Sequence, residues 1–263
     1  GSVIDKMEGA GDVNGAFIVC GVSIFVLMLL HSLTLIFSKE KPEEESEKVS
    51  VKLLLKELIT DKNLFKVILL SVLWNVVNYA STPFYGSYQI KELGFSMTFV
   101  SILSAAYAIV RTIFSRPMGK FADKYSFARM LNICFGIALA GFVVNVFTVP
   151  ENGKVFYTIY YMLYAISMAG INSATINLIF DYVEKGKRTG ALALKSTVCG
   201  FAGFFTTLIV SPLVGYVQQN NNELFGLPVY AQQVTSLISA VTLVVLIIYL
   251  NIVIRRIKKN ENN

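Results

Sequence analysis

The stretch "SRPMGKFADKYSFARML", Ser115–Leu131, lies between two long apolar runs and decides how the chain is interpreted. It combines a proline and a glycine, which together are typical of a turn or loop. Its charged side chains are Arg116, Lys120, Asp123, Lys124 and Arg129. The stretch therefore predicts a short, mainly basic connection in which one acid, Asp123, needs an explanation of its own.

The composition places the chain among membrane proteins. Hydrophobic residues make up 54% of the 263 residues and charged residues only 15%, against about 25% in a typical soluble domain. The three cysteines lie within apolar runs, and the single histidine, His31, cannot build a metal cluster alone. We expect no disulfide framework, no metal site and no cofactor. The basic residues flank apolar segments, which favours a membrane over a nucleic acid as partner.

Seven apolar segments are long enough to cross roughly 30 Å of hydrocarbon, which needs about 20 helical residues. The sequence therefore predicts an all-α polytopic membrane protein with seven transmembrane helices. They are expected at residues 14–37, 64–88, 97–116, 128–149, 154–181, 190–217 and 230–254.

A long polar stretch separates the first segment from the other six. Within it, Val51, Leu54, Leu55 and Leu58 follow the i, i+3, i+4, i+7 spacing of a short amphipathic helix on the membrane surface. We expect four parts along the chain. They are an outside leader and one helix (1–37), a cytoplasmic hinge (38–63), a six-helix bundle (64–254) and a cytoplasmic tail (255–263).

The basic residues orient the chain in the membrane. If the hinge is cytoplasmic, all of the 23 basic residues except Lys6, Lys91 and Lys154 lie on or near the cytoplasmic side. Cytoplasmic loops carry such an excess of lysine and arginine. We therefore expect the amino end outside, the carboxyl end inside, and the plasma membrane as the location.

Other functional classes share parts of this pattern. Seven helices with an outside amino end also occur in receptors and retinal proteins. However, residues 230–254 lack the lysine that binds retinal, and the receptor-type Asp-Arg-Tyr and Asn-Pro-x-x-Tyr signatures are absent. A membrane enzyme needs acids, histidines or cysteines clustered at membrane depth, and the sequence shows none. We expect no enzyme; a receptor-like, enzymatic or scaffold protein remains the alternative to a transporter.

The motif "GKFADKYSFAR" resembles the cytoplasmic loop signature of the major facilitator superfamily, Gly-x-x-x-Asp-(Arg/Lys)-x-Gly-(Arg/Lys)-(Arg/Lys). Gly119, Asp123 and Lys124 match it, Ser126 replaces the second glycine, and Arg129 stands one place late for the basic pair. Such departures resemble the family's second copy, between its eighth and ninth helices. The resemblance implies that the chain is the sixth helix, the hinge and the complete carboxy-terminal half, a 3+3 inverted repeat.

That resemblance also implies a function and a partner. The expected activity is secondary active or facilitative transport of a small solute by alternating access between two six-helix halves. The amino-terminal half would then be the missing partner, and we expect the fragment alone to be inactive and prone to self-association. In the family, an acid at the position of Asp123 helps latch the halves together; the alternative is a loop that its cations merely anchor inside.

A polar stripe on the second apolar segment marks the first candidates for a solute cavity. Its members are spaced 4, 3, 4, 3 and 4 residues apart, so they share one helical face that either lines a cavity or bonds to neighbouring helices. Pro83 and Gly86 predict a kink or break there. The resemblance implies the family's seventh helix, which lines the central cavity. The stripe comprises Ser71, Asn75, Asn78, Thr82, Tyr85 and Gln89, of which Asn75, Asn78, Thr82 and Tyr85 are the cavity candidates.

Three further residues complete the cavity candidates. Tyr164 and Asn172 lie deeper in residues 154–181 than Tyr157, which fits an outer aromatic belt. Arg111 is a full charge inside a predicted span; it either reaches back to the lipid headgroups or faces the cavity as an anion site or inter-helix partner. In residues 190–217 a small-residue face predicts close helix packing. That face comprises Ser196, Gly200, Gly203, Thr207 and Ser211.

The sequence leaves the solute open. No acidic residue lies at mid-membrane depth between the hinge and the carboxyl end. A coupling carboxylate is therefore expected in the missing half, or the protein is a facilitator. Asparagine, glutamine and tyrosine suit a neutral polar solute such as a sugar, and the aromatic content also suits a drug-like one.

Overall fold

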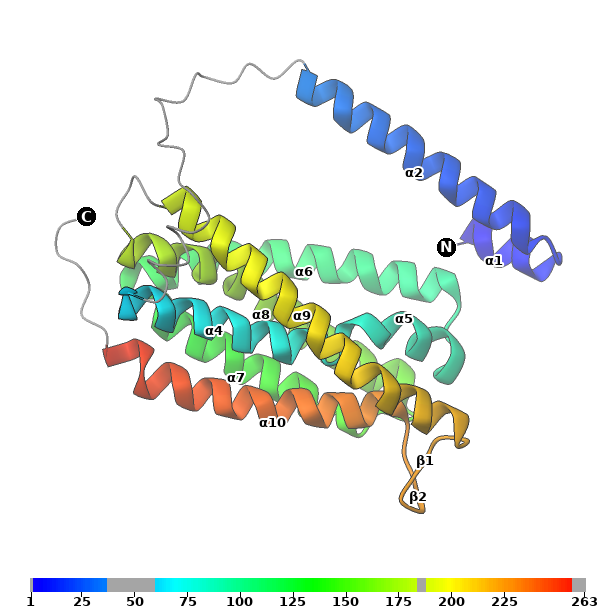
Figure 1. The fold of residues 1–263 in the computed structure, drawn as a ribbon. Coiled ribbons are helices and arrows are strands. Elements are labelled where there is room, and N and C mark those ends of the chain that lie inside the picture. The colour runs from blue at the N-terminus through cyan, green and yellow to red at the C-terminus, as the bar shows by residue number, and fades with distance from the viewer. Residues whose placement is uncertain (1, 37–59, 184–187, 257–263) are drawn as a thin grey trace.

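The computed structural model describes residues 2–36, 60–183 and 188–256, and helices dominate it (Figure 1). Seven helical stretches of the described residues are long and apolar enough to cross a membrane, which confirms the predicted number of spans. The amphipathic helix expected at 51–58, most of the hinge and the end of the tail lie outside the described residues. The long helices are α2 (Val13–Ile36), α4 (Lys62–Tyr79), α6 (Met97–Lys124), α7 (Phe127–Val146), α8 (Gly153–Tyr182), α9 (Arg188–Gln219) and α10 (Ala231–Ile252).

Shorter elements connect or flank these helices. A helix, α1 (Ser2–Gly9), precedes α2 within the expected leader, and a two-residue hairpin, β1 (Glu223–Leu224) with β2 (Leu227–Pro228), joins α9 to α10. Phe225 and Gly226 form its turn with positive φ of 52° and 79°, the backbone that two-residue hairpins require. Between α4 and α6 lie a 3₁₀ turn (Thr82–Phe84), α5 (Tyr85–Ser87) and a π-helical turn (Tyr88–Glu92); Ile254–Arg256 form a last 3₁₀ turn.

Polar side chains at the first turns fix where several helices begin. Asp61 precedes α4 and accepts from the backbone N–H groups of Asn63 and Leu64 at 2.8 and 3.2 Å. Ser96 caps α6 and Ser126 caps α7, each through its hydroxyl oxygen at 3.2 Å from the N–H three residues later. These bonds satisfy N–H groups that have no partner within the helix.

The six long helices from α4 to α10, which exclude the three-residue α5, form one bundle. Their contacts agree with the expected 3+3 repeat. Helix α4 packs on α9 and α10, and α8 packs on α6 and α7. In that repeat, α4, α6 and α7 correspond in order to α8, α9 and α10. Replacing each helix by its counterpart turns the α4–α9 contact into α8–α6 and the α4–α10 contact into α8–α7, and both are observed. The α4–α8 and α7–α10 contacts map onto themselves under the same exchange.

The third span continues much further than its predicted end. Residue 116 was expected to end it, with Pro117 and Gly119 leading into a loop, but α6 runs to Lys124. The expectation was wrong because the following turns are held by packing. Ala122 is buried, and Phe121 and Met118 pack on the core. Tertiary contacts thus outweigh the cost of a proline inside the helix. Only Tyr125 and Ser126 connect α6 to α7.

Helix α1 is tied to the bundle through one carboxylate. Asp5 accepts from the backbone N–H groups of Met97 at 2.8 Å and Thr98 at 2.7 Å, and from the Thr98 hydroxyl. It therefore caps the amino end of α6 from another part of the chain, where N–H groups and the helix dipole favour an anion. Helix α2 follows α1 and lies apart from the bundle, with most of its described side chains exposed (Figure 1).

This cap predicts a pH dependence. The hydrogen bonds from Thr98 hold the pKa of the Asp5 carboxyl below its usual value. A lowered pKa in the folded state means that the contact stabilises α1 on α6 above the ordinary aspartate pKa and is lost as the pH falls through the folded value, below about pH 4. We expect the amides of Met97 and Thr98 to lose protection from hydrogen exchange in that range, after correction for the intrinsic rate.

Two variants test the cap. Asp5→Ala should remove the protection already at neutral pH. Asp12→Ala is the matched control, because Asp12 precedes α2 and accepts at 2.9 Å from Gly15 in the first turn of that helix. Equal protection of Met97 and Thr98 in wild type and Asp5→Ala would show that the cap does not hold α1.

Candidate functional site

The candidate site is built around a break in the helix that follows Asp61. Helix α4 ends at Tyr79, and the chain continues through the 3₁₀, α and π turns up to Glu92. This confirms the break predicted from Pro83 and Gly86. Pro83 has no N–H, so the Tyr79 carbonyl lacks its donor within the helix. The Thr207 hydroxyl of α9 donates to it instead, at 3.4 Å.

A second carbonyl released by the break is satisfied from α10. The Ser81 N–H bonds to the Asn78 carbonyl at 3.3 Å and leaves the Val77 carbonyl free. The buried Ser239 hydroxyl donates to that carbonyl at 2.8 Å and accepts from the Ser81 hydroxyl at 2.7 Å. Irregular backbone at membrane depth is tolerated where neighbouring helices supply such partners. Hydroxyl groups of α9 and α10 therefore satisfy both carbonyls that the break releases.

The polar stripe of α4 does not form one open face. Its ends are buried: Ser71 bonds within its own helix, and Gln89 donates to the Tyr157 hydroxyl at 2.8 Å. Asn75 is half-buried and donates to the Ser71 carbonyl at 2.8 Å. The periodicity placed these residues on one side of the helix correctly, but it could not show which turns a neighbouring helix covers.

The middle of the polar stripe contacts helix α8. The Tyr164 hydroxyl of α8 donates to the side-chain carbonyl of Asn78 on α4. Thr82 lies one turn further along and donates to the Asn78 backbone carbonyl at 2.9 Å. Two candidates chosen separately from the sequence, Asn78 and Tyr164, thus lie in contact at the start of the break.

A cluster of tyrosines extends this contact to α6. The Tyr107 ring of α6 lies 5.0 Å from that of Tyr161 and 6.3 Å from that of Tyr164, measured between centroids. The guanidinium of Arg111, one turn beyond Tyr107, lies beside the Tyr107 hydroxyl and near that of Tyr164. We call Asn78, Tyr107, Arg111 and Tyr164 the polar junction. Tyr107 is not among the residues predicted from the sequence, although it stands four residues before Arg111 and so shares its face.

Two other cavity candidates, Tyr85 and Asn172, lie away from the polar junction. Tyr85 of α5 is buried against the rings of Tyr157 and Tyr160, at 6.3 and 5.8 Å, and its hydroxyl has no hydrogen-bond partner among the described residues. Asn172 lies about two turns beyond Tyr164 on α8 and is exposed. As cavity residues, all seven candidates stay predictions.

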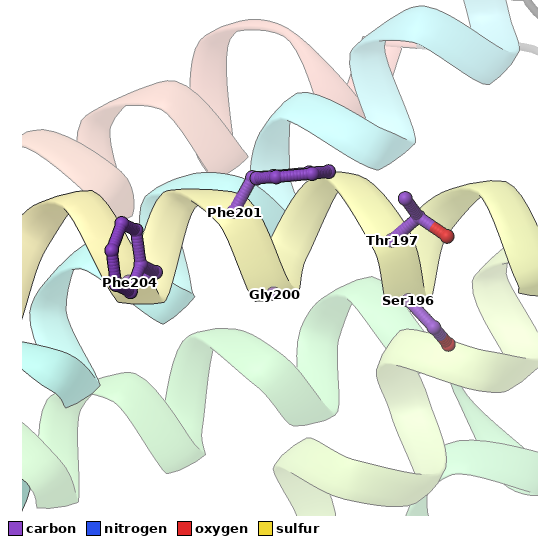
Figure 2. Close-up of a pocket in the computed structure, with 5 residues that line it drawn as sticks. All are labelled: Ser196, Thr197, Gly200, Phe201 and Phe204. Atoms are coloured by element: carbon purple, nitrogen blue, oxygen red, sulfur yellow. The ribbon is translucent and has the colours of Figure 1, made fainter.

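The small-residue face of α9 divides into a packed part and an open part. Gly203 is buried against the Tyr79 ring, where an added Cβ would lie 2.9 Å from the ring, so the predicted close packing is confirmed there. Ser196 and Gly200 are exposed instead and line a shallow hollow with Thr197, Phe201 and Phe204. Figure 2 shows all five residues on α9.

The predicted loop motif lies across the short α6–α7 connection. Gly119, Asp123 and Lys124 are in the last turns of α6, and Asp123 is exposed. Arg129 is in the first turn of α7, and both Lys124 and Arg129 approach the Tyr125 ring, at 5.3 and 6.0 Å. Among the residues that the structure describes, no three histidine, cysteine or acidic side chains are placed to bind a metal ion.

Comparison with solved structures identifies similar folds. The chain is 16% identical to a variant of the E. coli fucose:proton symporter FucP, with a TM-score of 0.58 over 95% of this chain and 60% of that chain. FucP in the outward conformation gives 15% identity and a TM-score of 0.57 over 95% and 59% of the two chains. A bacterial homolog of the human lysosomal transporter Spinster, inward-facing and unoccupied, gives 14% and 0.54 over 81% and 52%.

The chain thus spans about three fifths of the length of the symporter it resembles. No curated protein sequence matches it significantly. The family model of the Major Facilitator Superfamily matches residues 9–207, well over half of the chain. That match includes the motif at Gly119 and Asp123 and most of the helical bundle. The protein is a multi-pass membrane protein and belongs to the Major Facilitator Superfamily.

Proposed function

We propose that the chain forms one half of a transporter that moves a small solute across the membrane by alternating access. The observation that carries this proposal is the polar junction at the broken α4 segment, where Tyr164 bonds to Asn78. Broken helices beside polar side chains are typical of solute sites in secondary transporters. Membership of a transporter superfamily favours transport over the receptor, enzyme and scaffold alternatives.

The uncovered side of the bundle supports a missing partner half. Helices α6 and α9 are the most exposed spans of the bundle; α6 lies on the side nearest α2, and α9 crosses the bundle diagonally (Figure 1). Large apolar side chains stand out from them, among them Ile109 at 59%, Phe204 at 61% and Ile209 at 75% exposed. An amino-terminal six-helix half is the proposed cover of this face. The chain alone is then inactive and self-associates.

The proposed location follows the basic residues. Arg116, Lys120 and Lys124 are exposed along the end of α6, and Arg255 and Arg256 are exposed after α10. We propose that the carboxyl ends of α6 and α10 face the cytoplasm at the plasma membrane and that the start of the chain lies outside. Asp123 is then available to the partner half as one side of a cytoplasmic latch.

Uptake by the full-length gene product in liposomes tests the site. Asn75→Ala and Asn78→Ala are each expected to lower uptake. Asn78→Ala should do so by about ten-fold or more, since it leaves the buried Tyr164 hydroxyl without its acceptor. Tyr164→Phe removes the other side of the same bond and should resemble Asn78→Ala.

Thr242→Ala is the control for this test. Its hydroxyl bonds to the Ile238 carbonyl of its own helix, α10, at 2.8 Å, so uptake should be unchanged. Wild-type uptake in both asparagine variants would contradict the assignment of this stripe to the cavity.

A further inference from the structure

Arg111 is a charged side chain in the middle of a spanning helix. It stands 14 residues after Met97 and 13 before Lys124, about 20 Å from either end of α6 at 1.5 Å per residue. The predicted span 97–116 would instead put Arg111 only five residues from the end of the helix. Its side chain is half-buried, so it is neither fully in solvent nor packed into the core.

The direction of the side chain argues against contact with lipid headgroups. Helical side chains lean toward the amino end of their helix. The Arg111 guanidinium follows this rule and lies beside Tyr107, one turn earlier. It thus points away from Arg116, Lys120 and Lys124, which mark the end of α6 where headgroups lie nearest.

Among the described residues, the guanidinium has a hydroxyl neighbour but no acid at its level. Tyr107 lies beside it, and the Tyr164 ring lies 6.3 Å from the Tyr107 ring. In the described residues 60–183 and 188–256, acidic side chains stand only at helix ends or in connections. They are Asp61, Glu92, Asp123, Glu151, Asp181 and Glu223. A cation held at membrane depth is costly unless an anion joins it.

We propose that Arg111, with the Tyr107 hydroxyl, binds a carboxylate or phosphate group of the transported solute. This rests on the proposed transport function and assigns an anionic solute where the sequence left the solute open. Arginine pairs with both groups through two parallel N–H donors, and the Tyr107 hydroxyl supplies a further donor to the same oxygens. The contact Tyr164–Asn78 links that anion site to the break after α4.

Matched pairs of probes test the charge of the ligand. We would measure the melting temperature of the purified full-length gene product with benzoate against benzamide, gluconate against glucitol, and glucose 6-phosphate against glucose, at constant ionic strength. At least one anion should raise the melting temperature more than its neutral partner. Arg111→Gln should abolish that difference, and Arg111→Lys, which keeps the charge but not the fork, should retain part of it.

Arg116→Gln is the control, because it removes one cation from the same helix outside the polar junction and should keep the full shift. The inference is overturned if no anion exceeds its neutral partner, or if the difference survives in Arg111→Gln. It is also overturned if Arg111→Gln melts lower without any probe while wild type ignores anions. In that outcome the counter-charge is a carboxylate of the amino-terminal half.

Transport separates this inference from the proposed function. For an anionic solute, Arg111→Gln should raise KM by about ten-fold or more, in line with the loss of hydrogen bonds to a charged group. If Arg111→Gln leaves a measurable uptake of both anionic and neutral solutes unchanged, the transport function stands and the anion site is contradicted. Absence of uptake in wild type, together with an anion-specific shift in melting temperature, contradicts transport and keeps the site.

Discussion

Replacing Trp74 by alanine is expected to lower the free energy of unfolding by about 3 kcal/mol, the largest stability effect of any single change proposed for this chain. Trp74 lies on α4 just before the break, and its ring stacks on that of Phe135 of α7 at a centroid distance of 5.4 Å and an angle of 24°. Both rings are buried, at 5% and 0% exposed. Truncation therefore leaves a cavity between two helices.

The magnitude stands at the lower end of the range for large aromatic residues because lipid surrounds the separated helices. Little apolar transfer energy is gained when helices associate in a bilayer, so lost packing contributes most of the effect. Unfolding by SDS in mixed micelles, followed by circular dichroism, measures it. Phe65→Ala on the same helix is the control, since Phe65 is 48% exposed. Equal losses in the two variants would contradict the assigned role of Trp74.

Gly170→Ala is expected to destabilise the α7–α8 contact by about 1–3 kcal/mol through overpacking. A Cβ at this position would lie 2.5 Å from the sulfur of Cys134, which is fully buried on the facing helix. Gly200→Ala is the control, because a Cβ there meets nothing within 4 Å. The same SDS unfolding measurement applies, with circular dichroism as the readout.

A second substitution makes this prediction sharper. Cys134→Ala alone should cost about 1 kcal/mol for the space it opens, whereas Cys134→Ala combined with Gly170→Ala should recover most of the stability, because the new methyl group occupies the place of the sulfur. The two changes are then strongly non-additive, as expected for residues in contact. Additive losses would show that the clash at Gly170 is relieved elsewhere.

The sequence predicted the spans and the break well, because both depend on local chemistry. Apolar length identifies a helix that crosses the hydrocarbon, and Pro83 removes a donor wherever it stands. The partners of the break were not predictable. Thr207 and Ser239 are far away in sequence, and only the packing of α9 and α10 beside α4 brings their hydroxyls to the released carbonyls.

The candidate site was predicted in part for the same reason. Asn78 and Tyr164 were both chosen as polar residues on helical faces, and they meet in the structure. Gln89 was chosen by the same rule but is buried against Tyr157. Periodicity gives the side of a helix, whereas burial depends on which neighbouring helix covers each turn.

The unexpected length of α6 has a mechanical consequence. Arg111 and Asp123 stand on one uninterrupted helix, 12 residues apart, which is about 18 Å along its axis. Helix α6 thus connects the middle of the span to the loop motif at Gly119 and Asp123. A tilt of about 10° around the level of Arg111 displaces Asp123 by about 3 Å at this rise per residue, roughly the length of a hydrogen bond. A small tilt of α6 around the level of Arg111 is therefore enough to make or break a contact of Asp123.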